Sequence, residues 1–572
     1  MSRIAGIDLG TSTSEIAILI DGKPHVIPNR EGELITPSVV GVLEDGMIIA
    51  GREAREQLLL RPKDTVIEVK RLMGSGTGVV MGGKEYTPQQ VSSYIIKYLV
   101  DCASEYLGER IERAVVTVPA YFSDEQRRAT VEAGKLAGIK VERILNEPTA
   151  ASLDYGIDHM TECRNVLVYD LGGGTLDVTV LEMFEGVLEV KASCGNNRLG
   201  GKDFDAALTD FMLERFTERT GLDVSDDSRA MMRIKEVSER CKITLSSEYE
   251  YLITLPFFAN VQGNPVSLEE MITRDGFESL IADMIDSTEQ QIKTALADAG
   301  LGTADLDLVL LVGGSTRIPY VRQFIRKVLQ KEPETLVDPD LAVVRGAAVQ
   351  AAILNEELSE GRNILITDVC PYTLGISVLG NVGGILMPDV YNVIIPRNIT
   401  IPVIREKTYC TVQDNQEKIE IIAYQGDYKR ASKNNLLGRF YLDGIPPAPA
   451  FKEKIKVMFS YDVNGILHVE GTVVSTGMKA DISVETTGVE MSVESDPDRW
   501  KDMPGARKYR VVLNKAERII KKEKAGVYEM EIDVLAKDIR DGLVKGCDPE
   551  ALDKIKEDLE DLLLEAEEEA ND

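Results

Sequence analysis

The sequence predicts a multidomain protein that combines a two-lobed α/β domain, an antiparallel β-sandwich and a short α-helical segment. Two similar strand–turn–strand patterns, at residues 3–19 and 166–181, suggest a duplicated lobe. Short alternating strands fill residues 371–485, and long helical patterns follow them. A chain of 572 residues is too long for one hydrophobic core, so several domains are expected.

The two strand–turn–strand patterns share their chemistry. RIAGIDLGTSTSEIAIL and the stretch around DLGGGTLD each lead an apolar strand into Asp-Leu-Gly, place a Thr after the last Gly and return as a strand. Glycine lets backbone N–H groups approach a ligand, and such turns form anion nests. The adjacent Asp would repel a bare phosphate, so the pair predicts a nucleotide phosphate accompanied by a divalent cation. Two tight hairpins without a ligand are the alternative.

A third glycine signal is LDLVLLVGGSTRIP, in which the apolar run 306–312 ends at Gly313 and Gly314. This pattern is typical of a ligand crevice at the carboxyl edge of a parallel sheet. Two glycines permit close approach to a flat ring, and Arg317 can stack on a base. GGKDFD, at residues 200–205, is a weaker fourth loop that is equally compatible with a plain turn, and no Walker A motif is present.

Composition limits the possible ligands and locations. The net charge of −30 disfavours nucleic acid and anionic membranes as partners. No apolar run approaches the roughly 18 residues of a membrane span, and the N-terminus has no signal-peptide pattern, so we expect a cytoplasmic protein. Seven cysteines without a C-x-x-C pair and three isolated histidines predict neither a disulfide framework nor a zinc site.

A set of longer strings then resembles a known family. GIDLGTSTS, KRLMG, VVTVPAYFSDEQRRAT, RILNEPTAASLDYG, DLGGGTLDVTVL, RLGGKDFD, SERCKITLSS and LVGGSTRIP occur in the order seen in DnaK-type chaperones, the seventy-kilodalton heat-shock family. The resemblance runs from residue 3 to about residue 485. It implies an actin-like ATPase domain (1–361), an interdomain linker (362–369), a β-sandwich peptide-binding domain (370–490) and an α-helical lid (498–572).

The resemblance also implies an activity, ligands and partners. The activity is ATP-dependent binding and release of extended apolar segments of unfolded polypeptides, with hydrolysis coupled to the cleft through the linker. The implied ligands are ATP or ADP, Mg²⁺ and K⁺, and the implied protein partners are a J-domain co-chaperone and a nucleotide-exchange factor. A small-molecule kinase, a filament former and a nucleotide-dependent scaffold without useful hydrolysis share such a clamp and stay open as alternatives.

Roles in the nucleotide site follow residue by residue from the resemblance. Asp8, Asp170 and Glu147 would hold magnesium through water and orient the attacking water, while Asp177 would lie beside potassium. Lys70, which reads from sequence alone as a surface lysine, would face the γ-phosphate. The other implied nucleotide contacts are Gly10, Thr11, Ser12, Gly172, Gly173, Gly174, Thr175 (also catalytic), Gly200, Gly201, Glu239, Lys242, Ser246, Gly313, Gly314, Ser315, Arg317 and Asp340.

The segment RNILITDVCP should link the motor to the rest of the chain. Linkers are normally polar, so its Ile and Leu residues are expected to dock, although a plain edge strand is the alternative. By resemblance, Pro119 and Arg127 would relay the nucleotide state, and Asp368 with Arg143, Asn146 and Thr149 would meet a J-domain partner. VPAYFSDEQR could equally be a strand end followed by a helix that is capped by Ser123 with Gln126.

The alternating strands of residues 371–485 indicate an antiparallel sandwich, with Asn464-Gly465 as a hairpin turn. An open sheet edge with apolar pockets accepts an extended peptide. By resemblance this cleft would be lined by Ile376, Leu379, Tyr409, Val412, Ile419 and Ile421. Core packing is the alternative, favoured more for Ile376 and Ile421 than for Tyr409 and Val412. LGNVGGILMPDVYNVIIPRN is longer than the corresponding loop of the family, which affects the placement of Leu379.

The C-terminal helices complete the prediction. Asp548 and Pro549 form a helix start, and Leu552, Ile555, Leu559 and Leu562 share one face, as expected of a short lid. The loop SGTGVVMGGKEYTPQQ is shorter than in most relatives and lies near the region where exchange factors bind. Dependence on an exchange factor is therefore open.

Overall fold

The computed structural model describes residues 3–481, apart from 158, 160, 161, 262, 263, 335, 336, 359–363, 383 and 384, and parts of 505–563. The chain divides into two compact units. The first comprises Met1–Asp427 and Leu437–Val484, and the second comprises Tyr428–Leu436 and Glu485–Asp572. The predicted boundaries at 361–362 and 490–498 fall on residues outside the described part and stay predictions.

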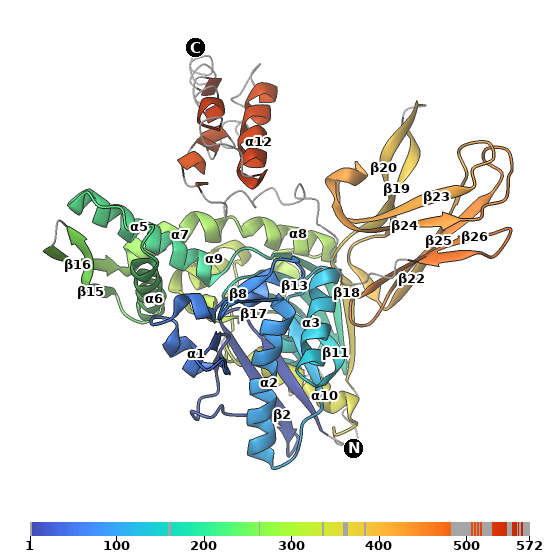
Figure 1. The fold of residues 1–572 in the computed structure, drawn as a ribbon. Coiled ribbons are helices and arrows are strands. Elements are labelled where there is room, and N and C mark those ends of the chain that lie inside the picture. The colour runs from blue at the N-terminus through green and yellow to red at the C-terminus, as the bar shows by residue number, and fades with distance from the viewer. Residues whose placement is uncertain are drawn as a thin grey trace. The chain divides into compact units, whose positions relative to one another are not determined.

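The first lobe is built on a mixed sheet (Figure 1). Its strand order is β11-β10-β1-β2-β3, with β1, β10 and β11 parallel, and β1–β2 as the first predicted hairpin. Helices α2 and α3 pack side by side on this sheet, and a small three-stranded sheet adjoins it. The bounds are β1 Ile4–Leu9, β2 Thr13–Ile20, β3 Lys23–Val26, β4 Thr36–Pro37, β5 Val40–Val42, β6 Ile48–Ala50, α1 Arg52–Gln57, η1 Pro62–Asp64, β7 Thr65–Val66, η2 Val69–Leu72, β8 Val79–Met81, β9 Lys84–Tyr86, α2 Pro88–Leu107, β10 Arg113–Val118, α3 Asp124–Leu136 and β11 Lys140–Asn146.

The second lobe repeats the plan. Its sheet has the order β17-β12-β13-β14-β18-β21, and β12–β13 is the second predicted hairpin. β17 runs parallel to β12, so the glycines after β17 reach the same sheet edge as the turn after β12. The bounds are α4 Glu147–Gly156, β12 Arg164–Leu171, β13 Leu176–Phe184, β14 Val187–Asn196, α5 Gly201–Thr220, α6 Ser228–Leu245, β15 Glu250–Val261, β16 Asn264–Thr273, α7 Arg274–Asp286, α8 Glu289–Ala299, η3 Thr303–Asp305, β17 Leu308–Val312, η4 Gly314–Arg317, α9 Pro319–Leu329 and α10 Ala342–Leu354.

Helices α4 and α10 join the two lobes. They pack against each other and against strands of the first sheet, and α4 also contacts strands of the second. One apolar cluster contains Val115 of the first sheet, Val168 of the second and Ala347 of α10, all fully buried. Gly346 permits this packing, because a Cβ there would lie 1.7 Å from the Ala150 carbonyl oxygen. The predicted two-lobed α/β domain is therefore confirmed, with the turns of both hairpins on the side where the lobes face each other.

The predicted sandwich is also confirmed. Its two four-stranded sheets have the orders β20-β19-β23-β24 and β22-β25-β26-β27. The turn Asn464-Gly465 connects β25 to β26, and Gly465 has a φ of 71°. The bounds are β19 Leu374–Val382, β20 Ile385–Ile395, β21 Ile399–Ile401, β22 Val403–Cys410, β23 Lys418–Gln425, η5 Ala431–Lys433, β24 Asn435–Asp443, β25 Lys454–Tyr461, β26 Leu467–Val473 and β27 Lys479–Asp481.

The apolar segment after α10 forms β18, Leu365–Cys370. Its first half pairs parallel to β14 of the second lobe, and its second half pairs antiparallel to β21. The segment therefore lies between β14 and β21 in the second lobe's sheet, rather than forming a plain edge strand. Its role as an interdomain linker stays a prediction. The rest of the predicted linker, residues 362 and 363, lies outside the described residues.

The second compact unit contains the helical C-terminal segment, of which α12 spans Glu529–Lys545. Leu552, Ile555, Leu559 and Leu562 belong to its apolar cluster, as the sequence predicts. The predicted helix start at Asp548 and Pro549 lies outside the described residues. Within the described part of the chain, no helix is long and apolar enough to span a membrane.

Candidate nucleotide site

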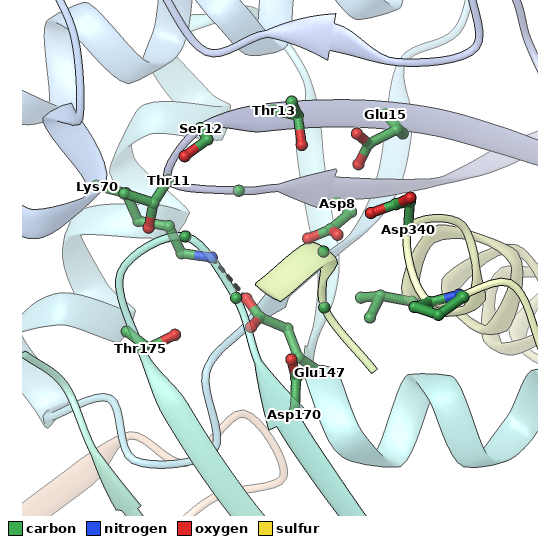
Figure 2. A pocket seen from close by; sticks show the side chains of 17 residues that line it. Asp8, Thr11, Ser12, Thr13, Glu15, Lys70, Glu147, Asp170, Thr175 and Asp340 are labelled. Carbon is green, nitrogen blue, oxygen red and sulfur yellow. Dashed lines mark hydrogen bonds and ion pairs between the residues drawn. The ribbon is translucent and has the colours of Figure 1, made fainter. Parts of the chain in front are cut away.

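A pocket lies between the two hairpin turns and the end of β17 (Figure 2). Thirteen of the predicted site residues line it, together with four that sequence reasoning missed. The predicted ones are Asp8, Gly10, Thr11, Ser12, Lys70, Glu147, Asp170, Gly172, Gly173, Thr175, Gly313, Gly314 and Asp340. The missed ones are Thr13, Glu15, Pro339 and Val343.

The first turn requires glycine for space. A Cβ on Gly10 would lie 2.1 Å from the Thr13 carbonyl oxygen, so a side chain does not fit. The Gly10 amide donates to Ser14 Oγ at 3.2 Å, and Ser38 Oγ donates to the Gly10 carbonyl at 2.9 Å. These bonds fix the turn that lines the pocket.

The second turn is supported from behind by the GGKDFD loop. Gly172 N donates to Thr175 O at 3.1 Å, which closes the turn, while Gly201 N donates to Gly172 O at 3.0 Å. A Cβ on Gly200 would lie 2.5 Å from Gly174 N. The pocket lining does not include Gly174, Gly200 or Gly201. Gly200 and Gly201 support the second turn from behind, and Gly174 is a residue of that turn.

Lys70 and Glu147 form a buried ion pair in the pocket, with Lys70 Nζ 2.5 Å from Glu147 Oε1 (Figure 2). Lys70 is 5% exposed, so the interpretation of Lys70 as a surface lysine is wrong. Burial lowers the pKa of Lys70, but Glu147 and Asp8 outweigh it and the net shift is upward. Burial raises the pKa of Glu147 to about 7, against the opposing effect of Lys70.

Several further acids line the pocket beside the Lys70–Glu147 pair. Asp8 accepts from Thr117 Oγ1 at 2.6 Å, and burial raises its pKa. Burial also raises the pKa of Asp170 well above its usual range, and no hydrogen-bond partner of Asp170 Oδ2 is found among the described residues. Glu15, 2% exposed, carries a second unpartnered oxygen. The pocket therefore holds more carboxylates than cations, which suits a positively charged ligand component.

The acids fit a water-coordinated Mg²⁺ better than a direct cage. Within the described residues, no group of three His, Cys, Asp or Glu side chains could ligate a metal directly. Mg²⁺ keeps several of its waters and is commonly bound by one or two carboxylates together with phosphate oxygens. The orphaned Asp170 Oδ2 and the nearby Asp8 are oxygen donors of that kind.

Asp177 does not line the pocket but connects the lobes. It is 1% exposed and accepts from Ala120 N and Tyr121 N, each at 3.2 Å, in the segment that follows Pro119 of the first lobe. Burial raises the pKa of Asp177 to about 6, although both backbone N–H groups oppose the shift. The carboxylate of the second lobe therefore holds a segment of the first.

The remaining predicted nucleotide residues gather on α6 and after β17. Ser315 Oγ donates to Gly172 O of the second turn at 2.8 Å, and Lys242 Nζ donates to Gly201 O of the supporting GGKDFD loop at 2.9 Å. Arg317 pairs with Asp338 and Asp340. Ser246 Oγ donates to the Lys242 carbonyl at 3.2 Å, the i−4 bond of a helix end.

Glu239 of α6 connects the second lobe to α1 of the first. It pairs with Arg55 and, at 2.8 Å, with Lys202. Burial raises the pKa of Glu239, but Lys202 and Arg55 outweigh burial and hold that pKa at about 2. The ion pair with Arg55 therefore connects the two lobes.

The predicted relay residues, Pro119 and Arg127, are both buried. Arg127, 3% exposed, donates to Ala120 O at 3.0 Å, to Asn146 Oδ1 at 2.8 Å and to Asn464 O of the sandwich at 3.3 Å. Ser123 and Gln126 form the capping box of α3, so the alternative reading of VPAYFSDEQR as a capped helix start is confirmed. The relay role of Pro119 and Arg127 stays a prediction.

The predicted partner-surface residues meet the linker. Thr149 Oγ1 donates to Asp368 Oδ2 at 3.1 Å, and Asn146, Thr149 and Asp368 are all buried. Arg143, partly buried, donates to Gln350 at 3.4 Å. The bond between Thr149 and Asp368 therefore ties α4 to β18.

The six predicted cleft residues divide by exposure. Ile376 and Ile421 are buried in the sandwich core, Tyr409 and Ile419 are partly buried, and Leu379 and Val412 are exposed. Tyr409 donates its hydroxyl to Asn392 at 2.9 Å. Leu379 lies at a break in the β19–β20 register, in the long hairpin that the sequence singled out.

Comparison with known proteins agrees with this geometry. The chain matches the profile of the family described as "Hsp70 protein" over residues 4–78 and 75–571. It is 48% identical to "Chaperone protein DnaK" of Thermotoga maritima over 484 residues, which cover 84% of this chain and 80% of the relative. The DnaK of Thermosipho melanesiensis is 45% identical over 523 residues, covering 90% and 86%. The chain belongs to the Hsp70 protein family and is an Hsp70-type molecular chaperone with ATPase activity.

Proposed function

We propose that ATP and Mg²⁺ bind between the twin turns and that hydrolysis controls a groove for extended polypeptide in the sandwich. The observation that carries this proposal is the buried Lys70–Glu147 pair, which lies between two glycine turns beside two acids that each keep one oxygen without a hydrogen-bond partner among the described residues. A triphosphate with its cation brings both the negative groups that glycine amides bind and the positive charge that the acids need.

The residues divide the chemistry of phosphoryl transfer to water. Lys70 places its ammonium beside the pocket, where it stabilises negative charge on the transferred phosphoryl group. Glu147, whose carboxyl is poised by burial, orients the attacking water. Thr175 closes the second turn and keeps its hydroxyl in the pocket. Mg²⁺, held through water by Asp8, Asp170 and Glu147, supplies charge neutralisation when bound.

The potassium and adenosine sites belong to the same proposal. K⁺ is proposed near Asp177, whose two oxygens otherwise accept from backbone amides. The adenosine is proposed between α6 and the Gly313-Gly314 turn, where Glu239, Lys242, Ser246, Ser315 and Arg317 gather.

Strand β18 is the proposed connection between hydrolysis and the groove. Strand β18 pairs with both β14 and β21 and leads into the sandwich. A shift of the second lobe would therefore move the strand from which the sandwich begins. Release of that strand would free the sandwich to hold a client at Leu379, Tyr409, Val412 and Ile419, with Ile376 and Ile421 beneath them.

The proposed partners follow from the family. A J-domain protein would act at Arg143, Asn146, Thr149 and Asp368 once the linker moves, and an exchange factor would reopen the lobes. The cytoplasm is the proposed location. Stimulation of the ATPase by a J-domain protein and an apolar peptide tests the first of these.

Release of a fluorescent apolar peptide tests the central proposal. Adding ATP with Mg²⁺ to the preloaded protein should accelerate release, and chelating Mg²⁺ should abolish the effect. Lys70→Ala and Thr175→Ala should keep ATP binding but stop turnover. If both variants sustain a complete chaperone cycle, the protein is a nucleotide-dependent scaffold, and absence of any acceleration contradicts the chaperone mechanism.

A further inference from the structure

Tyr372 lies between β18 and β19, where the linker enters the sandwich. Its ring packs on that of Tyr121, with the centroids 4.4 Å apart and the planes inclined by 50°. Its hydroxyl donates to the Tyr121 carbonyl oxygen. Tyr121 follows β10 and belongs to the first lobe, so this pair joins the sandwich to that lobe.

The second lobe holds the same peptide segment. Asn197 Nδ2 donates to the Tyr121 carbonyl at 2.6 Å, and Asp177 accepts from the amides of Ala120 and Tyr121. A carbonyl oxygen has two lone pairs and can serve both Tyr372 and Asn197. One short segment of the first lobe is therefore held at once by the second lobe and by the sandwich.

Two other sets of hydrogen bonds each join two of these bodies. Arg127 and Asp124 of the first lobe bond Asn464 and Leu467 of the sandwich. Asp298 of the second lobe accepts from Arg397 and Asn398. Among the hydrogen bonds of the described residues, side chains from the second lobe and from the sandwich converge on the first lobe at the Tyr121 carbonyl.

This convergence makes the bond of Tyr372 sensitive to the position of the lobes. Hydrogen bonds weaken steeply once their distance and angle leave a narrow range. We propose that Tyr372 is a coupling residue, through which the sandwich senses the relative position of the two lobes at the Tyr121 carbonyl. This inference rests on the proposed function, because it assumes that nucleotide moves the lobes.

The variant Tyr372→Phe tests the inference, because it keeps the ring and removes the hydroxyl. Tyr391→Phe is the matched control, since the Tyr391 hydroxyl bonds within the sandwich in the described part of the chain, to Thr373 O at 2.9 Å and Tyr424 O at 3.0 Å. The readouts are melting temperature, peptide affinity without nucleotide, and the acceleration of peptide release by ATP. Tyr372→Phe should reduce that acceleration about 5-fold, the effect of one hydrogen bond, with the other two readouts nearly unchanged.

Asn197→Ala supplies a second arm. If both side chains act through one carbonyl, the double variant with Tyr372→Phe should lose less acceleration than the product of the single losses. Wild-type acceleration in Tyr372→Phe, an equal loss in Tyr391→Phe, or independent effects of the two substitutions would each overturn the coupling role. If the wild-type protein shows no acceleration, the proposed function fails and the inference falls with it.

Discussion

Lys70 Nζ and Glu147 Oε1 lie 2.5 Å apart in an ion pair that is almost completely buried and that joins η2 to the start of α4. Removing one partner of such a pair costs about 3–5 kcal/mol, because the other charge stays buried without compensation. The pair therefore has a proposed catalytic role and a structural one, and mutation can separate the two.

Lys70→Ala should lower kcat by about 100- to 1000-fold. This is the usual effect of removing one group that stabilises the charge of the transition state. ATP affinity should change less, because the glycine turns remain. The double variant Lys70→Ala/Glu147→Gln should recover the melting temperature but not the turnover. Lys97→Ala, at an exposed pair with Asp101, is the control. Turnover that survives in Lys70→Ala would exclude the assigned role.

Gly200→Ala should weaken nucleotide binding at least 10-fold. The new Cβ would lie within 2.7 Å of three backbone atoms of Gly173 and Gly174, so the second turn has to shift. Overpacking of this kind costs about 1–3 kcal/mol. Gly302→Ala is the matched control, since its nearest atom would be a side-chain oxygen at 3.5 Å. Calorimetric titration with ADP measures the difference, and equal affinities would contradict the bracing role of the GGKDFD loop.

Local sequence signals predicted much of the site. Asp-Leu-Gly turns, the apolar run before Gly313, the Ser123 capping box and the Asn464-Gly465 turn are all encoded within a few residues, and each is found. Local rules work there because the strands and caps depend on neighbouring side chains.

The residues that local reasoning misjudged depend on distant partners. Lys70 is buried because its ammonium pairs with Glu147, which lies 77 positions later in the sequence. Glu15 stands in a strand buried along almost its whole length, so its polar character gave no signal that it lines a pocket. The first half of β18 pairs with β14 and the second half with β21. Both partners are distant in the sequence, so local patterns could not predict this pairing.

Asp368→Ala should loosen the docked linker. Asp368 accepts from Thr149 Oγ1 at 3.1 Å and from its neighbour Val369 N at 2.8 Å, and it is 6% exposed. Its loss removes a buried bond between linker and α4, worth about 1 kcal/mol. Protease cleavage near residue 365 should become about 5-fold faster with ATP present. Thr149→Val should give a similar increase, and unchanged cleavage in both would rule out this contact as an anchor.

Glu239→Gln should destabilise the ATPase domain in a pH-dependent way. The folded pKa of Glu239 is about 2, below the ordinary value of 4.5, so the ionised carboxylate favours the folded state. That contribution is complete above pH 4.5 and declines as pH falls toward 2. At one pKa unit per about 1.4 kcal/mol, the difference from wild type should reach about 3 kcal/mol at neutral pH.

Thermal unfolding of both proteins between pH 7 and pH 3 measures this difference, with Glu236→Gln as the control, since Glu236 pairs with Arg240 on the exposed face of the same helix. Wild type and Glu239→Gln should converge in melting temperature toward the acid end, whereas Glu236→Gln should follow wild type throughout. A gap that stays constant with pH would show that Glu239 stabilises the lobes by packing rather than by its charge with Arg55 and Lys202.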